Sequence, residues 1–128
     1  NKGVLRGLHF QKIPHEQGKL VSIVSGKVLD VAVDLRKNSR TFKKWYSAIL
    51  SGENRKMMYI PEGFAHGFLA VEDSYFSYKC TREYSPKFEA GIIWNDPDLN
   101  INWQLNDFGI ATPIISEKDL SLPHVSDL

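Results

Sequence analysis

The chain has 128 residues, a length that fits one folded domain. Lys and Arg total 16 against 15 Asp and Glu, and this balance argues against a protein that binds nucleic acid or an anionic membrane through a large basic surface. The single cysteine, Cys80, excludes an internal disulfide and a metal site built from several thiolates. No apolar run approaches the ~20 residues that cross a bilayer, and no signal segment opens the chain, so we expect a cytoplasmic protein.

Short segments rich in β-branched and aromatic residues, separated by turn residues at fairly even spacing, predict an all-β sandwich or barrel. The expected strands are residues 4–11, 19–25, 27–35, 45–50, 56–60, 67–71, 75–82 and 91–94. Ser25-Gly26-Lys27 is expected to form a tight hairpin, because glycine tolerates a positive φ. Asn95-Asp96-Pro97-Asp98 predicts a turn, and Ser116 predicts the cap of one helical turn.

The segment 27–35 has a strict two-residue period. Its apolar face, which runs from Leu29 to Leu35, is expected to pack in a hydrophobic layer. The other face carries Asp30 and Asp34 among small residues, which suits either a solvated outer surface or the wall of a polar cavity. Because a solvated face is the commoner setting for such a strand, we expect these carboxylates to lie on the outside.

Two of the four histidines, His9 and His66, lie in apolar segments that contain glycine, whereas His15 and His124 have polar surroundings typical of exposed loops. A buried histidine beside a carboxylate is a poised base, because its reference pKa is ~6.5 and the carboxylate fixes the tautomer. The alternative for each is a structural core histidine. For Tyr78 and Lys19, likewise, the alternatives are a core aromatic and a solvated cation.

The spacing Pro-x-Gly-x-x-His in residues 61–66 is similar to the second sequence motif of cupin barrels. Metal-binding cupins also carry a His-x-His pair, and no such pair occurs in this chain. Two separated histidines with carboxylates still suit iron or zinc, but the missing pair disfavours a metal-dependent cupin.

Longer motifs, in the same order along the chain, resemble the dTDP-4-dehydrorhamnose 3,5-epimerase family. They are GVLRGLHFQ (3–11), QGKLV (17–21), VLDVAVDLR (28–36), IPEGFAHGF (60–68), YK (78–79) and WND (94–96). The resemblance extends from Gly3 to about Asp119. It implies one all-β domain over residues 1–128 that folds as a cupin-type jelly roll with a short irregular or helical C-terminal segment. It also implies that this domain lacks the family's N-terminal segment and that the protein forms a homodimer.

The resemblance also implies roles for individual residues. His9 would be the catalytic base and Asp30 its carboxylate partner, while Tyr78 would be the general acid and Lys19 would lie beside the C4 oxygen. The implied substrate-binding residues are Arg6, His66, Tyr84 and Asp119. Neither a metal nor a cofactor is implied.

The implied reaction is the epimerisation of dTDP-4-keto-6-deoxy-D-glucose at C3 and C5, on the route to dTDP-L-rhamnose. A ketone at C4 acidifies the C–H bonds at C3 and C5, and inversion needs a base on one face and an acid on the other. The alternatives are a relative that inverts only C3 or C5, a metal-dependent cupin enzyme, and a non-catalytic sugar-nucleotide binder.

One geometric conflict follows from the spacing of Arg6 and His9. In a regular strand these two side chains point to opposite faces of the sheet. Both can reach one ligand only if Gly7 allows a twist or a bulge, or if Arg6 serves another part of the site.

Overall fold

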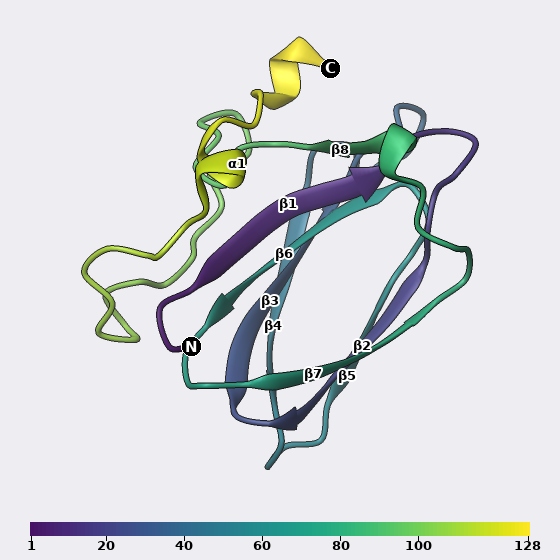
Figure 1. Ribbon diagram of the computed structural model, residues 1–128. Helices are drawn as coiled ribbons and strands as arrows, with labels where there is room; N and C mark the ends of the chain where they lie inside the picture. The colour runs from purple at the N-terminus through teal and green to yellow at the C-terminus, as the bar shows by residue number, and fades with distance from the viewer.

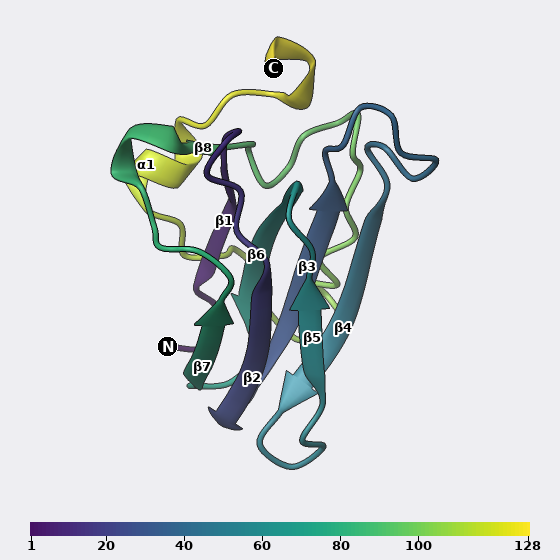
Figure 2. The same ribbon diagram turned by 90° about the vertical axis from the view of Figure 1, so that its right-hand side faces the viewer.

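The computed structural model covers residues 1–128 and contains two antiparallel sheets that face one another (Figures 1 and 2). The strands are β1 (Leu5–Gln11), β2 (Lys19–Ser25), β3 (Lys27–Asp34), β4 (Trp45–Ser51), β5 (Met57–Ile60), β6 (Phe64–Ala70), β7 (Tyr75–Cys80) and β8 (Glu89–Gly91). One sheet has the order β4-β3-β6-β1-β8 and the other the order β5-β2-β7. The helical pieces are α1 (Glu117–Leu120) and the 3-10 turns η1 (Pro86–Phe88) and η2 (Val125–Asp127). None of them is long and apolar enough to cross a membrane.

Seven of the eight expected strands exist, and most of their ends lie within two residues of the expected position. The expected strand at residues 91–94 is wrong in its bounds, because β8 spans Glu89–Gly91 and shares only Gly91 with it. The turn at Gly26 also exists, with a φ of +93°, but the expectation of a hairpin there is wrong. β2 pairs with β5 and β7, whereas β3 pairs with β4 and β6. The turn therefore carries the chain from one sheet to the other instead of joining paired neighbours.

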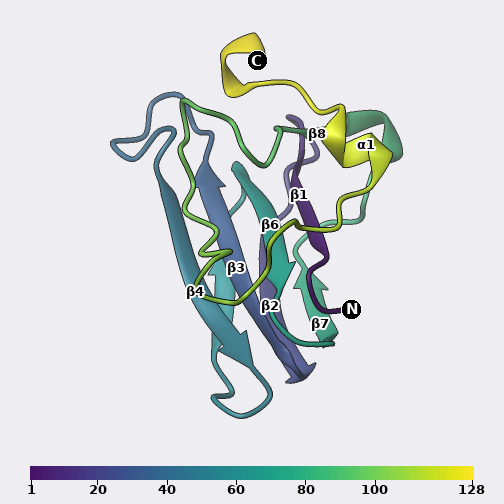
Figure 3. The ribbon, with the colours of Figure 1, turned by 90° about the vertical axis from the view of Figure 1, so that its left-hand side faces the viewer.

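β3 is buried on both faces, so the expected solvated face is wrong. Leu29, Val31 and Val33 pack in a hydrophobic cluster with residues of the C-terminal segment, among them Trp103 and Val125. Figure 3 shows that segment, in green to yellow, crossing the outer side of the five-stranded sheet. The opposite face of β3, which bears the two carboxylates, consequently lies between the sheets.

A bulge in β1 resolves the conflict between Arg6 and His9. Arg6 is paired with Phe68 and His9 with His66, so two residues of β1 lie opposite the single residue Gly67. Gly7 takes a φ of +119°, which favours glycine. The extra residue turns both Arg6 and His9 toward the space between the sheets.

Asp34 organises the end of β3 and the loop that follows. Its side chain is almost fully buried and accepts hydrogen bonds from the guanidinium and the backbone N–H of Arg36, and from the hydroxyls of Ser39 and Thr41. These donors favour the ionised carboxylate and hold the pKa of Asp34 far below its ordinary value, against the opposing effect of burial.

We expect this carboxylate to make the fold sensitive to acid. Its pKa is lowered in the folded chain, so its contribution to stability is complete above the unfolded pKa of ~3.9 and is lost as the pH falls below that value. The difference in unfolding free energy between the wild type and Asp34→Asn should therefore shrink as the pH is lowered from about 5 to 2 in denaturant titrations. Asp107→Asn, at an exposed carboxylate without hydrogen bonds, is the control and should show no such trend.

The C-terminal segment forms the two local structures that the sequence predicts. Ser116 caps α1, and its hydroxyl accepts a hydrogen bond from the N–H of Asp119. In the turn at residues 95–98, the buried Asp96 accepts hydrogen bonds from the N–H groups of Asp98, Leu99 and Val125. The segment is thereby tied down over the sheet, with Asp119 directed at β1.

Candidate active site

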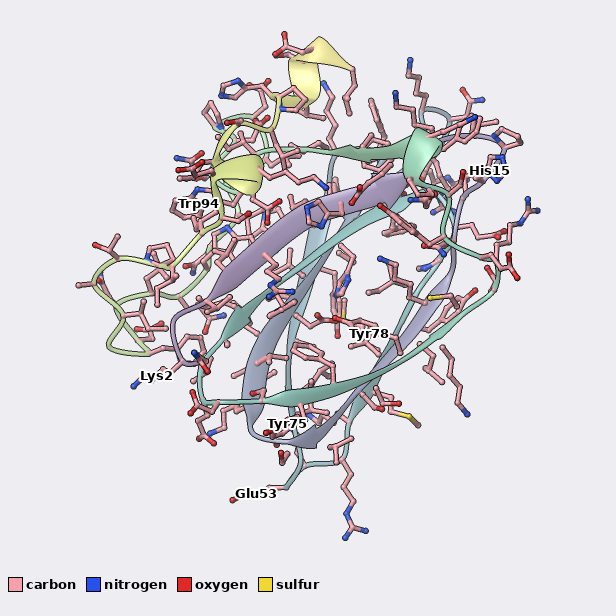
Figure 4. The ribbon with its side chains drawn as sticks, in the orientation of Figure 1. Lys2, His15, Glu53, Tyr75, Tyr78 and Trp94 are labelled. Atoms are coloured by element: carbon pink, nitrogen blue, oxygen red, sulfur yellow. The ribbon has the colours of Figure 1, made fainter.

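A cavity of about 200 Å³ lies between the two sheets. It is lined by Arg6, His9, Lys19, His66, Gly67, Phe68 and Tyr78. β1 and β6 supply one wall, and β2 and β7 supply the other. Five of the lining residues are ones that the sequence singles out. Figure 4 shows the labelled Tyr78 extending from β7 toward the five-stranded sheet.

His9 forms a close pair with Asp119. The Nε2 of His9 lies 2.6 Å from Oδ1 of Asp119, and the other carboxylate oxygen accepts the N–H of Gly7 at 3.2 Å. The Asp119 side chain is buried, while that of His9 is 30% exposed. A carboxylate in this position fixes the ring, leaves Nδ1 as the free nitrogen and stabilises an imidazolium.

The expected partnership of His9 with Asp30 is wrong. Asp30 instead lies 2.6 Å from Nε2 of His66, in a pair that is almost completely buried. The strand order explains the difference, because β6 lies between β3 and β1 and brings His66, not His9, next to Asp30. The structure therefore contains two histidine–carboxylate pairs where the sequence predicts one.

The opposite wall carries Tyr78 and Lys19. Tyr78 is paired with Val21, two residues along β2 from Lys19, so both side chains project from the same face. Tyr78 is 45% exposed, and its partial burial raises its pKa to about 12, with a further contribution from the negative charge of Asp30. Burial lowers the pKa of Lys19, while nearby acidic groups, Cys80 and Asp30 among them, act in the opposite direction. The Tyr78 phenol therefore keeps its proton at neutral pH.

Tyr84 lies outside the cavity, although the resemblance implies a substrate contact. Its ring is exposed, and its hydroxyl donates a hydrogen bond of 2.6 Å to Glu89, which also accepts one from Lys118. This hydrogen bond raises the pKa of Tyr84 and lowers that of Glu89. The sequence motifs give no sign of Glu89.

The sequence could have predicted Phe68 as a residue that lines the cavity. It lies two residues after His66 in the same strand, so both side chains project from the same face.

The two largest of the other cavities hold no comparable set of proton-transfer groups. One, of about 440 Å³, is lined by Trp94 and residues 101–107, among which Asp107 is the only ionisable side chain. The other, of about 640 Å³, lies at the ends of β1 and β3 beside Lys12 and Lys37 and contains no histidine. No three His, Cys, Asp or Glu side chains are grouped so that they could hold a metal ion.

The family model described as dTDP-4-dehydrorhamnose 3,5-epimerase matches residues 1–127. A curated relative of that name from Methanothermobacter thermautotrophicus is 55% identical over 119 residues, which cover 92% of this chain and 63% of the relative. A relative of the same name from Shigella flexneri is 50% identical over 121 residues, which cover 94% of this chain and 64% of the relative. This chain thus spans less than two thirds of the length of these relatives.

Solved structures show the same similarity. The dTDP-4-dehydrorhamnose 3,5-epimerase of Elizabethkingia anophelis matches with a TM-score of 0.92 and 49% identity, over 98% of this chain and 68% of that one. An epimerase of Legionella pneumophila in complex with dTDP-4-keto-L-rhamnose matches with a TM-score of 0.91 and 47% sequence identity. The match covers 98% of this chain and 64% of that one. A 3'-monoepimerase of Streptomyces bikiniensis matches with a TM-score of 0.90 and 33% sequence identity. That match covers 99% of this chain and 62% of the other. These matches confirm the cupin-type jelly roll expected from the sequence.

Proposed function

Because this chain belongs to the dTDP-4-dehydrorhamnose 3,5-epimerase family, we propose that it converts dTDP-4-keto-6-deoxy-D-glucose to dTDP-4-dehydro-L-rhamnose by inverting C3 and C5, for dTDP-L-rhamnose synthesis. The observation that carries the proposal is the pair His9–Asp119 on one wall of the cavity, opposite Tyr78 and Lys19. The Legionella pneumophila relative, solved with dTDP-4-keto-L-rhamnose, supports this substrate class. The homodimer and the cytoplasmic location belong to the same proposal.

The cavity has the groups that the reaction needs. The free Nδ1 of His9 accepts the proton from the carbon next to the ketone, and Asp119 stabilises the imidazolium that forms. The electrons of the broken C–H bond become those of an enolate, whose oxygen Lys19 stabilises. Tyr78 returns a proton from the opposite wall, which inverts the carbon.

A single-centre epimerase is the second candidate function. The observation that favours it is the match to the Streptomyces bikiniensis 3'-monoepimerase, which has the same fold at 33% identity. Both activities use an enolate next to the C4 ketone, so the wall residues serve either of them.

The experiment is incubation of the protein with dTDP-4-keto-6-deoxy-D-glucose in D₂O, followed by NMR. We expect deuterium at both C3 and C5, because each abstracted proton is replaced from the solvent. Deuterium at one carbon only would establish the single-centre function instead. Deuterium at neither carbon, with a folded protein that binds the nucleotide sugar, would contradict both.

A further inference from the structure

We propose that the cavity of about 640 Å³ at the ends of β1 and β3 is a second ligand site, which binds an organic phosphate with the build of a nucleoside diphosphate. Its volume lies within the range of about 300–1,000 Å³ that is usual for small-molecule sites. It shares no lining residue with the catalytic cavity. The second site therefore goes beyond the proposed epimerase function and does not depend on it.

The floor of this cavity is apolar and anchored to the core. Phe10 and Leu35 line it, and both pack against the hydrophobic cluster on the outer side of the five-stranded sheet. Ile13 also lines the cavity, with a side chain that is 79% exposed. A flat or apolar part of a ligand that covers these side chains removes their surface from water, which favours binding.

The charged lining of the cavity is mainly cationic. Lys12, Arg36 and Lys37 line it, against the single acidic residue Glu16. Both lysines are exposed, and neither forms an ion pair within the chain. The carboxylate of Glu16 is likewise unpaired and offers an acceptor for hydroxyl groups of a ligand.

The loop that follows β3 adds positive charge around the cavity. Residues 36–44 contain five Lys or Arg residues and no Asp or Glu. Only Arg36 among them forms an ion pair, with Asp34. Figures 1 and 2 show this loop at the same end of the molecule as the segment after β1, which carries Lys12. Because the net charge of the whole chain is only +1, this local concentration attracts anions to one end of the molecule.

Arg36 is held in a fixed position beside the cavity. Its Nε and Nη2 donate to the two carboxylate oxygens of Asp34, each at 3.0 Å, and its guanidinium carbon lies 4.9 Å from the centre of the Phe64 ring. Gly63 leaves room for the side chain, since a Cβ there would lie 2.6 Å from Cγ of Arg36. The remaining nitrogen, Nη1, has no acceptor within the chain. Its two N–H groups are thus available to an anion at a small entropic cost.

Gln11 is a second polar side chain with a free donor. The residue is 7% exposed, and it lines this cavity and not the catalytic one. Its Oε1 accepts the N–H of Ser85 at 3.0 Å, whereas its Nε2 has no acceptor within the chain. Nearly buried polar groups are usually hydrogen-bonded, so this amide marks a position for an oxygen acceptor from outside the chain.

These features together specify the kind of ligand. Ammonium and guanidinium groups are the usual partners of phosphate oxygens in proteins. The apolar floor suits a nucleobase, and Glu16 suits the hydroxyls of a sugar. A nucleoside diphosphate has all three parts, whereas pyrophosphate engages the cations alone. ADP is therefore the probe, and pyrophosphate is the comparison.

The test follows backbone amide signals by NMR while the protein is titrated with ADP. We expect the amides of Gly63 and Asn38, which line the cavity, to shift along one saturating curve that weakens as salt is added. The amide of Gly67 reports the catalytic cavity separately. Pyrophosphate should bind about 10-fold more weakly than ADP, because it leaves the apolar floor uncovered.

The double variant Lys12→Ala/Lys37→Ala should weaken ADP binding at Gly63 by at least about 10-fold, because charge-assisted hydrogen bonds to the phosphates are lost. Lys56→Ala is the matched control. Lys56 is exposed, forms no ion pair and lies outside this cavity, so the affinity should be unchanged. Both variants should keep the turnover of the wild type, since none of the three lysines lines the catalytic cavity.

Three results would overturn the second site. The first is the absence of shifts at Gly63 and Asn38 with millimolar ADP, or shifts confined to Gly67. The second is an unchanged affinity in the double lysine variant. The third is pyrophosphate binding as tight as that of ADP, which would reduce the site to a place for inorganic anions. All three results concern binding, so they are independent of whether the protein epimerises its proposed substrate.

Discussion

Replacement of His9 by asparagine is expected to lower turnover about 10²–10⁴-fold, the usual contribution of a general base. Asparagine keeps a polar side chain beside Asp119 but has no nitrogen that accepts a proton at neutral pH. Single-turnover conversion of dTDP-4-keto-6-deoxy-D-glucose measures the loss. Affinity for the nucleotide sugar should remain within a few-fold of the wild type, because the base acts mainly in the transition state.

His124→Asn provides the matched control for that variant. His124 is exposed, lies in the C-terminal segment outside the cavity and makes no side-chain hydrogen bond. The same chemical change there should leave turnover unaltered. Turnover of His9→Asn at the wild-type rate would contradict the assignment of the base.

Replacement of Gly7 by alanine is expected to destabilise the fold strongly, with a loss on the order of 3 kcal/mol in the free energy of unfolding. An added Cβ would lie 2.7 Å from Cα of Gly67 and 2.8 Å from the carbonyl oxygen of His66, both of them backbone atoms that cannot rotate away. The φ of +119° adds strain for any residue with a Cβ. Denaturant unfolding of the two proteins measures the difference.

Gly109→Ala separates the two causes. Gly109 also has a positive φ, of +67°, but a Cβ there would meet nothing within 4 Å. We expect that variant to lose about 1 kcal/mol, from the backbone conformation alone. An equal loss in both variants would mean that the close approach of Gly7 to Gly67 contributes nothing.

Local patterns were sufficient to predict the strands but not their partners. The two-residue period in residues 27–35 predicts β3 correctly, yet it could not show that both faces of the strand are buried. The carboxylate face is covered by the other sheet, and the apolar face by the C-terminal segment, whose covering residues, such as Trp103, are about seventy positions away. The hairpin at Gly26 failed for the same reason, because a tight turn shows where a strand ends and not which sheet the next strand enters.

The site shows the same limit. The motifs selected His9, His66, Lys19 and Tyr78, and the structure brings all four to one cavity. The partners of the histidines depend on strand order and on α1, which no spacing reveals, so Asp30 was placed beside the wrong ring. Tyr84 is singled out by the resemblance alone, and its hydroxyl bonds Glu89, only five residues away, outside the cavity.

The extra residue in β1 has a consequence for protein engineering. Deletion of one residue between Arg6 and His9 would still leave both side chains on the same face, because positions two apart share a face. The restored ladder would, however, use the amide that Gly7 now donates to Asp119. A shortened strand would thus keep the orientation of His9 but remove one of the hydrogen bonds that position its carboxylate partner, Asp119. The irregularity is therefore best understood as the source of a free backbone donor.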